Sequence, residues 1–285
     1  MLRIGCVKYL NARPLIYGWS GAVDFDHPAA LCRKLARGDL DVALVSSLEY
    51  LRRPIYRIVD RVSISAHGAV YSVIVAHNQD LSRAQEIDID PASETSVALL
   101  RCLLRQRRFN PRLRVRNTDL QSVRRAELHS AEPATMRASA GPETAESMSA
   151  GRTGQGPVFR LLIGDQAIRF RAEHGERYHY WDLAETWTKM TSLPFAFAFW
   201  LIRPEIENAK EIADKLRALR DRNIASIDEL ALSQSEVSPA FCRKYYREHL
   251  FFDFGEGEKA GLREFHRRCR LNKIEVAPDL RLNLV

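Results

Sequence analysis

The chain has 285 residues, 46% of them hydrophobic and 28% charged, which provides enough apolar material for one large or two medium domains. Its formal net charge of +7 fits either a nucleic-acid-binding face or the attraction of an anionic small molecule. The two dense runs of arginine, residues 105–116 and 266–270, carry no nucleic-acid-binding motif. We interpret them as solvated helix faces and expect no nucleic-acid partner.

No apolar run reaches the roughly 18–20 residues that a membrane-spanning helix needs, so we expect no membrane segment. The N-terminal sequence MLRIGCV enters a strand-like run at once, without the pattern of a signal peptide, and favours a cytoplasmic location. The five cysteines are scattered and lack metal-ligand spacing, which predicts reduced, buried thiols. We expect no metal and no other cofactor.

From the N-terminus, apolar strand-like segments alternate with helical ones, a pattern typical of a parallel α/β sheet. Residues 3–7 (RIGCV) and 41–47 (DVALVSS) are predicted strands, and residues 27–40 between them are a predicted helix that ends at Gly38. Further strands are predicted at 55–60, 69–77 and 86–90, and an amphipathic helix is predicted within 91–109.

Residues 121–157 interrupt this alternation. They are rich in Ser, Ala, Gly, Glu and Pro and almost lack aromatic and β-branched residues, so we expect a disordered surface insertion. The alternation then resumes with a predicted strand at 158–164, followed by residues 178–194 and a predicted strand at 195–202. The last eighty or so residues are predicted to be helical, at 205–224, 238–250 and 258–271.

This order of elements describes two α/β lobes joined by two crossover strands. We expect residues 1–88 and 196–285 in one lobe and residues 89–195 in the other. In open α/β sheets, ligands bind outside the carboxyl ends of the strands. The polar residues at those ends are therefore the candidate functional residues.

Two strand ends in the first lobe carry such residues. Asn11 follows the first strand and precedes Pro14, a residue suited to the first turn of a helix. Its amide either caps that helix or points into a cleft, where it could both donate and accept hydrogen bonds. Ser46 and Ser47 end the strand DVALV, where they can cap the next helix and also present hydroxyls at the same edge as Asn11.

The second lobe has two comparable positions. Ser93, Thr95 and Ser96 begin the amphipathic helix, whose free N–H groups suit a carboxylate or phosphate, although capping explains the composition equally well. Gly164 and Asp165 end the strand RLLI, where Asp165 is either a helix cap or a carboxylate in the cleft. The sequence has no HExxH, GxSxG, P-loop or GxGxxG motif, and its histidines do not cluster.

Six blocks of sequence occur in the order found in the chorismate dehydratases of the futalosine route to menaquinone, which this sequence resembles over nearly its whole length outside 121–157. The blocks are RIGCVKYLNARPLIYG, DVALVSSLEY, GAVYSV, DPASETSVALLRCLL, LLIGDQAI and WDLAETWTKMTSLPFAFAFW. The resemblance implies a two-lobed fold like that of the type II periplasmic solute-binding proteins, with the ligand in a cleft between the lobes. It also implies a lyase that dehydrates chorismate to 3-[(1-carboxyvinyl)oxy]benzoate without a metal or organic cofactor.

The resemblance also suggests site residues by position. It places the family's strand-end Asn on Asn11 and its ligand-contacting serines on Ser46, Ser47 and Ser72; its SxTS turn falls on Ser93, Thr95 and Ser96, and its Gly-Asp pair on Gly164 and Asp165. Our hypothesis is that Asn11 orients the substrate and stabilises developing charge through its amide. The base that takes the ring proton is either Asp165 or a carboxylate of the substrate.

Proteins of other classes are expected to share this fold. A transport protein should carry a signal peptide or lipoprotein cysteine, and the effector domain of a transcription regulator should follow a helix-turn-helix segment. The related dihydroxynaphthoate synthase is expected to use a histidine base, and the NARPL and SETSVALL blocks favour the dehydratase over it. The alternatives are this synthase and a cytoplasmic small-anion binding protein of the same fold. The sequence does not indicate an oligomeric state.

Overall fold

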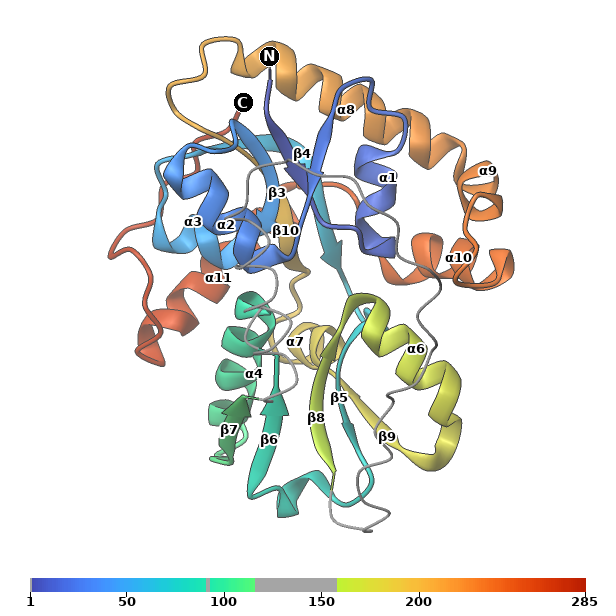
Figure 1. Ribbon diagram of the computed structural model, residues 1–285. Coiled ribbons are helices and arrows are strands. Elements are labelled where there is room, and N and C mark those ends of the chain that lie inside the picture. The colour runs from blue at the N-terminus through green and yellow to red at the C-terminus, as the bar shows by residue number, and fades with distance from the viewer. Residues whose placement is uncertain (1, 91–92, 116–157) are drawn as a thin grey trace, which may run out of the picture.

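The computed structural model describes residues 2–90, 93–115 and 158–285, so the insertion expected at 121–157 lies outside the described residues. The described chain forms two α/β lobes, each built around a five-stranded sheet (Figure 1). The first sheet has the strand order β2-β1-β3-β10-β4 and the second the order β7-β6-β8-β5-β9. The two-lobed α/β fold predicted from the sequence is confirmed.

The strands of the first sheet are β1 (Ile4–Cys6), β2 (Val23–Phe25), β3 (Val42–Ser46), β4 (Arg57–Ala66) and β10 (Phe195–Ile202). Those of the second sheet are β5 (Val73–His77), β6 (Glu86–Ile89), β7 (Arg112–Val115), β8 (Phe159–Ile163) and β9 (His179–Asp182). The helices of the first lobe are η1 (Leu10–Ala12), α1 (Arg13–Ile16), α2 (Pro28–Arg37), α3 (Ser47–Arg52), α8 (Ala209–Ala225), α9 (Ile227–Leu232), α10 (Pro239–Lys244), η4 (Tyr245–His249) and α11 (Glu256–Leu271). Those of the second lobe are η2 (Leu81–Arg83), α4 (Glu94–Gln106), α6 (Gly164–His174), η3 (Gly175–Arg177) and α7 (Leu183–Thr191).

Both sheets are mixed, which corrects the parallel sheet predicted from the alternation of strands and helices. β10 runs antiparallel to β3 and β4, and β5 runs antiparallel to β8 and β9. The reason is that β5 and β10 each follow a crossing between the lobes and lead away from the junction, whereas β1, β3, β6 and β8 run toward it (Figure 1). The carboxyl ends of these last four strands therefore meet between the lobes.

The chain first crosses between the sheets at residues 67–72, which lie between β4 and β5. The sequence predicts residues up to 88 in the first lobe, but β5 and the whole of β6, which begins at Glu86, belong to the second sheet. We therefore propose a lobe boundary at 67–72. The apolar residues of β4 and β5 are alike in composition, so their pattern did not indicate that the chain changes sheets between them.

Local sequence accounts for the elements that support the junction. β3 and β10 are nearly continuous apolar runs, and Phe199 and Trp200 at the centre of β10 are fully buried. This pattern is expected for central strands that are covered on both faces. α2 begins at Pro28, which needs no hydrogen-bond partner for a backbone N–H, and ends at Gly38 in the left-handed conformation (φ 84°).

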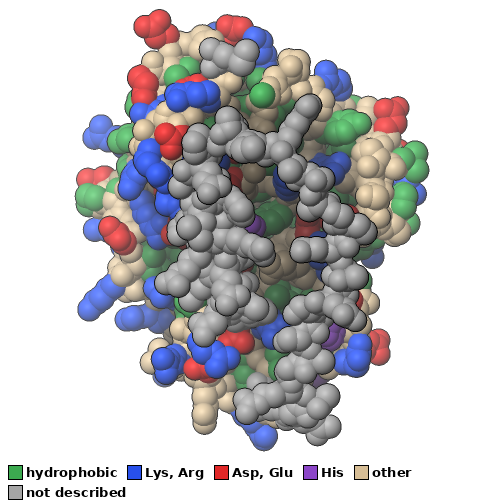
Figure 2. Space-filling model, in the orientation of Figure 1, with side chains coloured by type: hydrophobic (Ala, Val, Ile, Leu, Met, Phe, Trp, Pro, Cys, Tyr) green, Lys and Arg blue, Asp and Glu red, His purple; other side chains and the backbone are tan. Residues whose placement is uncertain are grey.

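Three arginines of the two dense runs pair with acidic side chains. Arg114 lies 2.6 Å from a carboxylate oxygen of Asp88, and Arg267 and Arg268 both pair with Glu264. On the face shown in Figure 2, basic and acidic side chains are interspersed over both lobes. Among the described residues, no helix combines the length and the apolar character needed to cross a membrane.

The chain crosses back to the first lobe just before β10. This crossover segment contacts α11 so closely that no side chain fits between them. A Cβ on Gly261 of α11 would lie 2.0 Å from the carbonyl oxygen of Pro194. That carbonyl is itself fixed, because the indole N–H of Trp187 donates to it at 3.3 Å. The helix can therefore approach the crossover segment this closely only with glycine at position 261.

We predict that Gly261→Ala lowers the free energy of unfolding by about 1–3 kcal/mol or more, because backbone atoms must move to relieve the overlap. Gly257→Ala is the matched control in the same helix, since its Cβ would meet only two ring carbons of Pro194, at 3.3 and 3.6 Å. The control should stay within about 1 kcal/mol of the unaltered protein. Urea unfolding measures both, and equal stability of the two variants would contradict this account of the contact.

Candidate functional site

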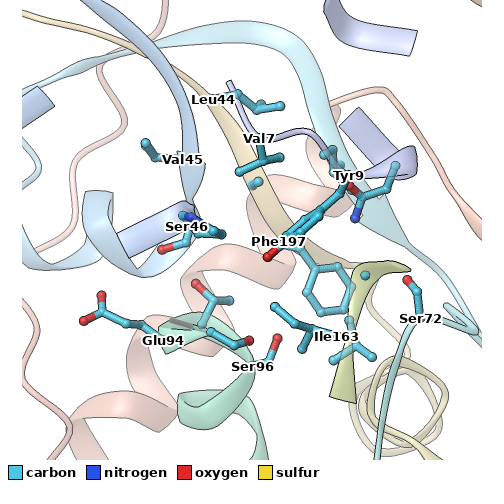
Figure 3. Close-up of a pocket in the computed structure, with 18 of the residues that line it drawn as sticks. Val7, Tyr9, Leu44, Val45, Ser46, Ser72, Glu94, Ser96, Ile163 and Phe197 are labelled. Carbon is cyan, nitrogen blue, oxygen red and sulfur yellow. The ribbon is translucent and has the colours of Figure 1, made fainter. Parts of the chain in front are cut away.

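A cavity of about 670 Å³, counted out to its opening, lies at the junction of the two lobes. The first lobe contributes the segment between β1 and η1 and the end of β3, and the second contributes the start of α4 and the β8–α6 junction (Figure 3). Most of the predicted site residues line it: Asn11, Ser46, Ser72, Ser93, Thr95, Ser96 and Gly164.

Asn11 lies in η1, directly beyond the end of β1, and its side chain caps no helix. The N-cap position of α1 belongs to Ala12, and no side chain caps that helix. The Oδ1 atom of Asn11 is buried and has no hydrogen-bond partner among the described residues. A buried acceptor without a partner costs about 1–3 kcal/mol, which a ligand that donates a hydrogen bond would recover. Of the two roles considered for Asn11, the geometry favours the amide that faces the cavity.

The two serines at the end of β3 differ in position. Ser46 occupies the N-cap position of α3 without making a capping hydrogen bond, and its buried hydroxyl has no partner beyond the weakly polar thiol of Cys32 beside it. Ser47 begins α3 and is fully buried, but it does not line the cavity. The structure thus brings Ser46, but not Ser47, to the cavity wall.

α4 begins at the cavity. Ser93 holds its N-cap position without a side-chain capping bond, and the first-turn N–H groups of a helix have no partner within the helix. The hydroxyl oxygen of Thr95 accepts a hydrogen bond from the backbone N–H of Leu48 at 3.1 Å, which connects α4 to α3 of the other lobe. The start of α4 therefore offers N–H donors to an anion and also helps to hold the lobes together.

The cavity is close to electrically neutral. Among the described residues no Lys or Arg lines it, and Glu94 is its one carboxylate. Glu94 forms an ion pair with Arg52 of α3 at 2.5 Å, which offsets its charge. The charge of a bound anion would therefore be met by hydroxyls and by the N-termini of α4 and α6, both of which begin at the cavity.

Gly164 is required where it stands for two reasons. Its φ of +52° lies in the left-handed region, and a Cβ there would be 3.2 Å from the ring of Tyr9. The N–H of Gly164 donates to the carbonyl oxygen of Ser72 at 2.8 Å, and the hydroxyl of Tyr245 donates to the hydroxyl oxygen of Ser72 at 2.6 Å. Ser72 is thus held between the crossover, α6 and the C-terminal part of the chain.

Asp165 does not line this cavity. It faces a separate depression, where its Oδ1 accepts a hydrogen bond from the backbone N–H of Leu10 at 2.9 Å. Burial raises the pKa of this carboxyl above its ordinary value, while the Leu10 N–H and nearby Arg13 act in the opposite direction. Asp165 therefore does not cap its own helix in this structure; it joins α6 to η1 across the junction.

Sequence reasoning missed two aromatic residues of the cavity, Tyr9 and Phe197. Tyr9 stands two residues before Asn11 in the same strand-end segment, so its position was a signal that could have been used. Phe197 is one of several aromatic residues in β10, and nothing in that apolar run separates a cavity residue from a core residue. Among the described residues, no group of three or more His, Cys, Asp and Glu side chains could hold a metal ion.

Solved structures of low sequence identity share this fold. AF1704 from Archaeoglobus fulgidus has a TM-score of 0.65 at 16% identity, over 96% of this chain and 98% of its own. The alkanesulfonate-binding protein SsuA from Xanthomonas axonopodis pv. citri, solved with bound MOPS, has a TM-score of 0.55 at 11% identity, over 97% of this chain and 94% of its own. The protein therefore has the periplasmic-binding-protein-like fold, as the sequence resemblance implied.

Within that class, the chain belongs to the menaquinone biosynthesis family, whose model matches residues 2–132 and 127–271. The chorismate dehydratase of Thermus thermophilus is 29% identical over 92% of this chain and 93% of its own length. The chorismate dehydratase of Campylobacter jejuni is 22% identical over 92% of this chain and 91% of its own length. The family indicated by the six sequence blocks is confirmed.

We predict that Asp165→Asn keeps turnover within a few-fold of the unaltered protein, because the amide oxygen can still accept the hydrogen bond from Leu10 N–H. Asp165→Ala removes the acceptor and should cost about 1–3 kcal/mol of stability, since a buried donor loses its partner. Steady-state kinetics with chorismate and thermal unfolding measure the two effects. A large loss of turnover in a stable Asp165→Asn protein would instead identify Asp165 as the base.

Proposed function

We propose that this protein is a chorismate dehydratase, a lyase that removes water from chorismate to give 3-[(1-carboxyvinyl)oxy]benzoate in the futalosine route to menaquinone. Two chorismate dehydratases that align with nearly the whole chain support this assignment. The observation that carries it at the site is Asn11, which lines a nearly neutral cavity between two helix N-termini and whose buried amide oxygen has no hydrogen-bond partner among the described residues.

The cavity suits a small dianion with a six-membered ring. Apolar side chains such as Val7, Ile64, Ile163 and Phe197 provide walls for the ring. The two carboxylates can bind to helix N-terminal amides and to the hydroxyls of Ser46, Ser93 and Ser96. The net charge of +7 favours the approach of such an anion from a distance.

The reaction removes the ring proton next to the enol ether and expels the neighbouring hydroxyl. Because the product ring is aromatic, the enzyme needs orientation more than strong acid–base groups. The amide of Asn11 can orient the substrate and stabilise the charge that develops during proton removal. Since Asp165 lies outside the cavity, its geometry favours a carboxylate of the substrate as the base.

Two other functions fit this fold less well. A dihydroxynaphthoate synthase is expected to use a histidine base, and no described residue that lines the cavity is a histidine. A small-anion binding protein would bind chorismate and leave it unchanged. Purified protein incubated with chorismate separates these cases: absorbance and mass spectrometry should detect the aromatic ether, and chorismate should raise the melting temperature. Thermal stabilisation without product would instead indicate a binding protein.

We predict that Asn11→Ala lowers turnover by about a hundredfold or more, because a donor that stabilises charge is lost. The melting temperature should change little, since the side chain caps no helix. Asn11→Asp should be at least as damaging as Asn11→Ala, because it puts a negative charge beside a dianionic substrate. Steady-state kinetics and thermal melts check both variants.

The exposed Asn110, just beyond α4, gives the control Asn110→Ala, which should keep full turnover. Near-normal turnover of Asn11→Asp would show that Asn11 has no part in the reaction and that its assignment to the site is wrong.

A further inference from the structure

Tyr9 places its phenol hydroxyl inside the cavity. The residue belongs to the segment between β1 and η1, and its ring packs against Gly164 of α6. Its hydroxyl points toward the middle of the cavity (Figure 3). No residue in the described part of the chain accepts a hydrogen bond from it. Tyr9 is therefore a hydrogen-bond donor aimed at the space that a ligand would fill.

The cavity offers few groups that can give up a proton. Among the described lining residues, only Tyr9 and Glu94 are ionisable. Glu94 is paired with Arg52, and its carboxylate lies on the far side of the cavity from Tyr9 and is directed away from its centre (Figure 3). The remaining polar residues are serines, a threonine and Asn11. Tyr9 is thus the lining residue best able to act as an acid.

The surroundings of Tyr9 keep its hydroxyl protonated. Burial raises the pKa of Tyr9, and the negative charges of Asp90 and Asp165 raise it further. A phenol is nevertheless a stronger acid than water. It can therefore give its proton to a hydroxyl that leaves as water.

We propose that Tyr9 is a catalytic residue that protonates the leaving hydroxyl, an inference that rests on the proposed dehydration of chorismate. As the ring C–H bond breaks, its electron pair joins the π system of the ring. The neighbouring C–O bond breaks with its pair on oxygen, and this oxygen takes the phenol proton and leaves as water. The base holds the ring proton and returns it to the Tyr9 phenolate, so one water leaves in each turnover and the protein is restored.

The matched pair Tyr9→Phe and Tyr56→Phe tests this role. Tyr9→Phe keeps the ring that packs against Gly164 and removes only the hydroxyl. Its single-turnover rate with chorismate should fall by about a hundredfold or more, with KM changed only a few-fold. Tyr56→Phe removes a buried phenol hydroxyl that is 3.5 Å from Glu49, outside the cavity, and should keep the rate of the unaltered protein.

The outcomes separate the catalytic step from the proposed function. An unaltered protein that does not convert chorismate overturns both. If the unaltered protein is active, a Tyr9→Phe rate within about threefold of it, or a rise in KM alone, overturns only the role of Tyr9. Should Tyr9→Phe melt at a much lower temperature, 3-fluorotyrosine at position 9 keeps the hydroxyl but makes it more acidic. A single-turnover rate that this replacement leaves unchanged also overturns the proposal.

Discussion

The hydrogen bond from the backbone N–H of Leu10 to Asp165 fixes the part of the chain on which the site depends. Leu10 lies between Tyr9 and Asn11, and its carbonyl oxygen also accepts a hydrogen bond from the hydroxyl of Tyr246 at 2.9 Å. The backbone N–H of Leu10 is thus held by α6 of the second lobe, and its carbonyl oxygen is held by η4. With Leu10 fixed, the two neighbouring side chains keep their positions at the cavity without using their own polar atoms, which leaves those atoms for a ligand.

The contacts that join the lobes involve the same residues that line the cavity. Thr95 lines the cavity and accepts from the backbone N–H of Leu48 in the first lobe. Glu94 lines it and pairs with Arg52. Ser72 lines it and is bound by Tyr245. A ligand at the cavity would therefore meet a wall whose geometry exists only when the two lobes are in contact, so binding and lobe contact support each other.

The electrostatic design of the cavity also follows from this arrangement. Lysines or arginines in the cavity would pair with the carboxylates of the substrate and lower the basicity of the carboxylate that takes the ring proton. Helix N-termini and hydroxyls provide weaker but oriented donors, and the apolar walls increase their effect by excluding water. In such a site, the difference in affinity between substrate and transition state depends on groups near the reacting atoms. Tyr9 and Asn11 are polar residues that the first lobe contributes to the cavity.

The sequence by itself determined the elements whose causes are local. Continuous apolar runs gave β3 and β10, Pro28 and Gly38 set the ends of α2, and the polar residues after strands placed Asn11, Ser46 and Ser93 at one cavity. These three residues line one cavity because strands that run toward one junction all end there, whatever their order in the sheet.

Only the tertiary structure decided whether a residue at one of these strand ends faces the cavity or turns away from it. The backbone at Gly164, at φ +52°, leaves Asp165 facing η1 instead of the cavity, and Asp165 meets Leu10, which is 155 positions away in the chain. Composition likewise could not separate Tyr9 from a core aromatic or assign β5 to the second sheet. These outcomes depend on contacts between residues far apart in the sequence, and a local pattern contains no information about the partner that a side chain will meet.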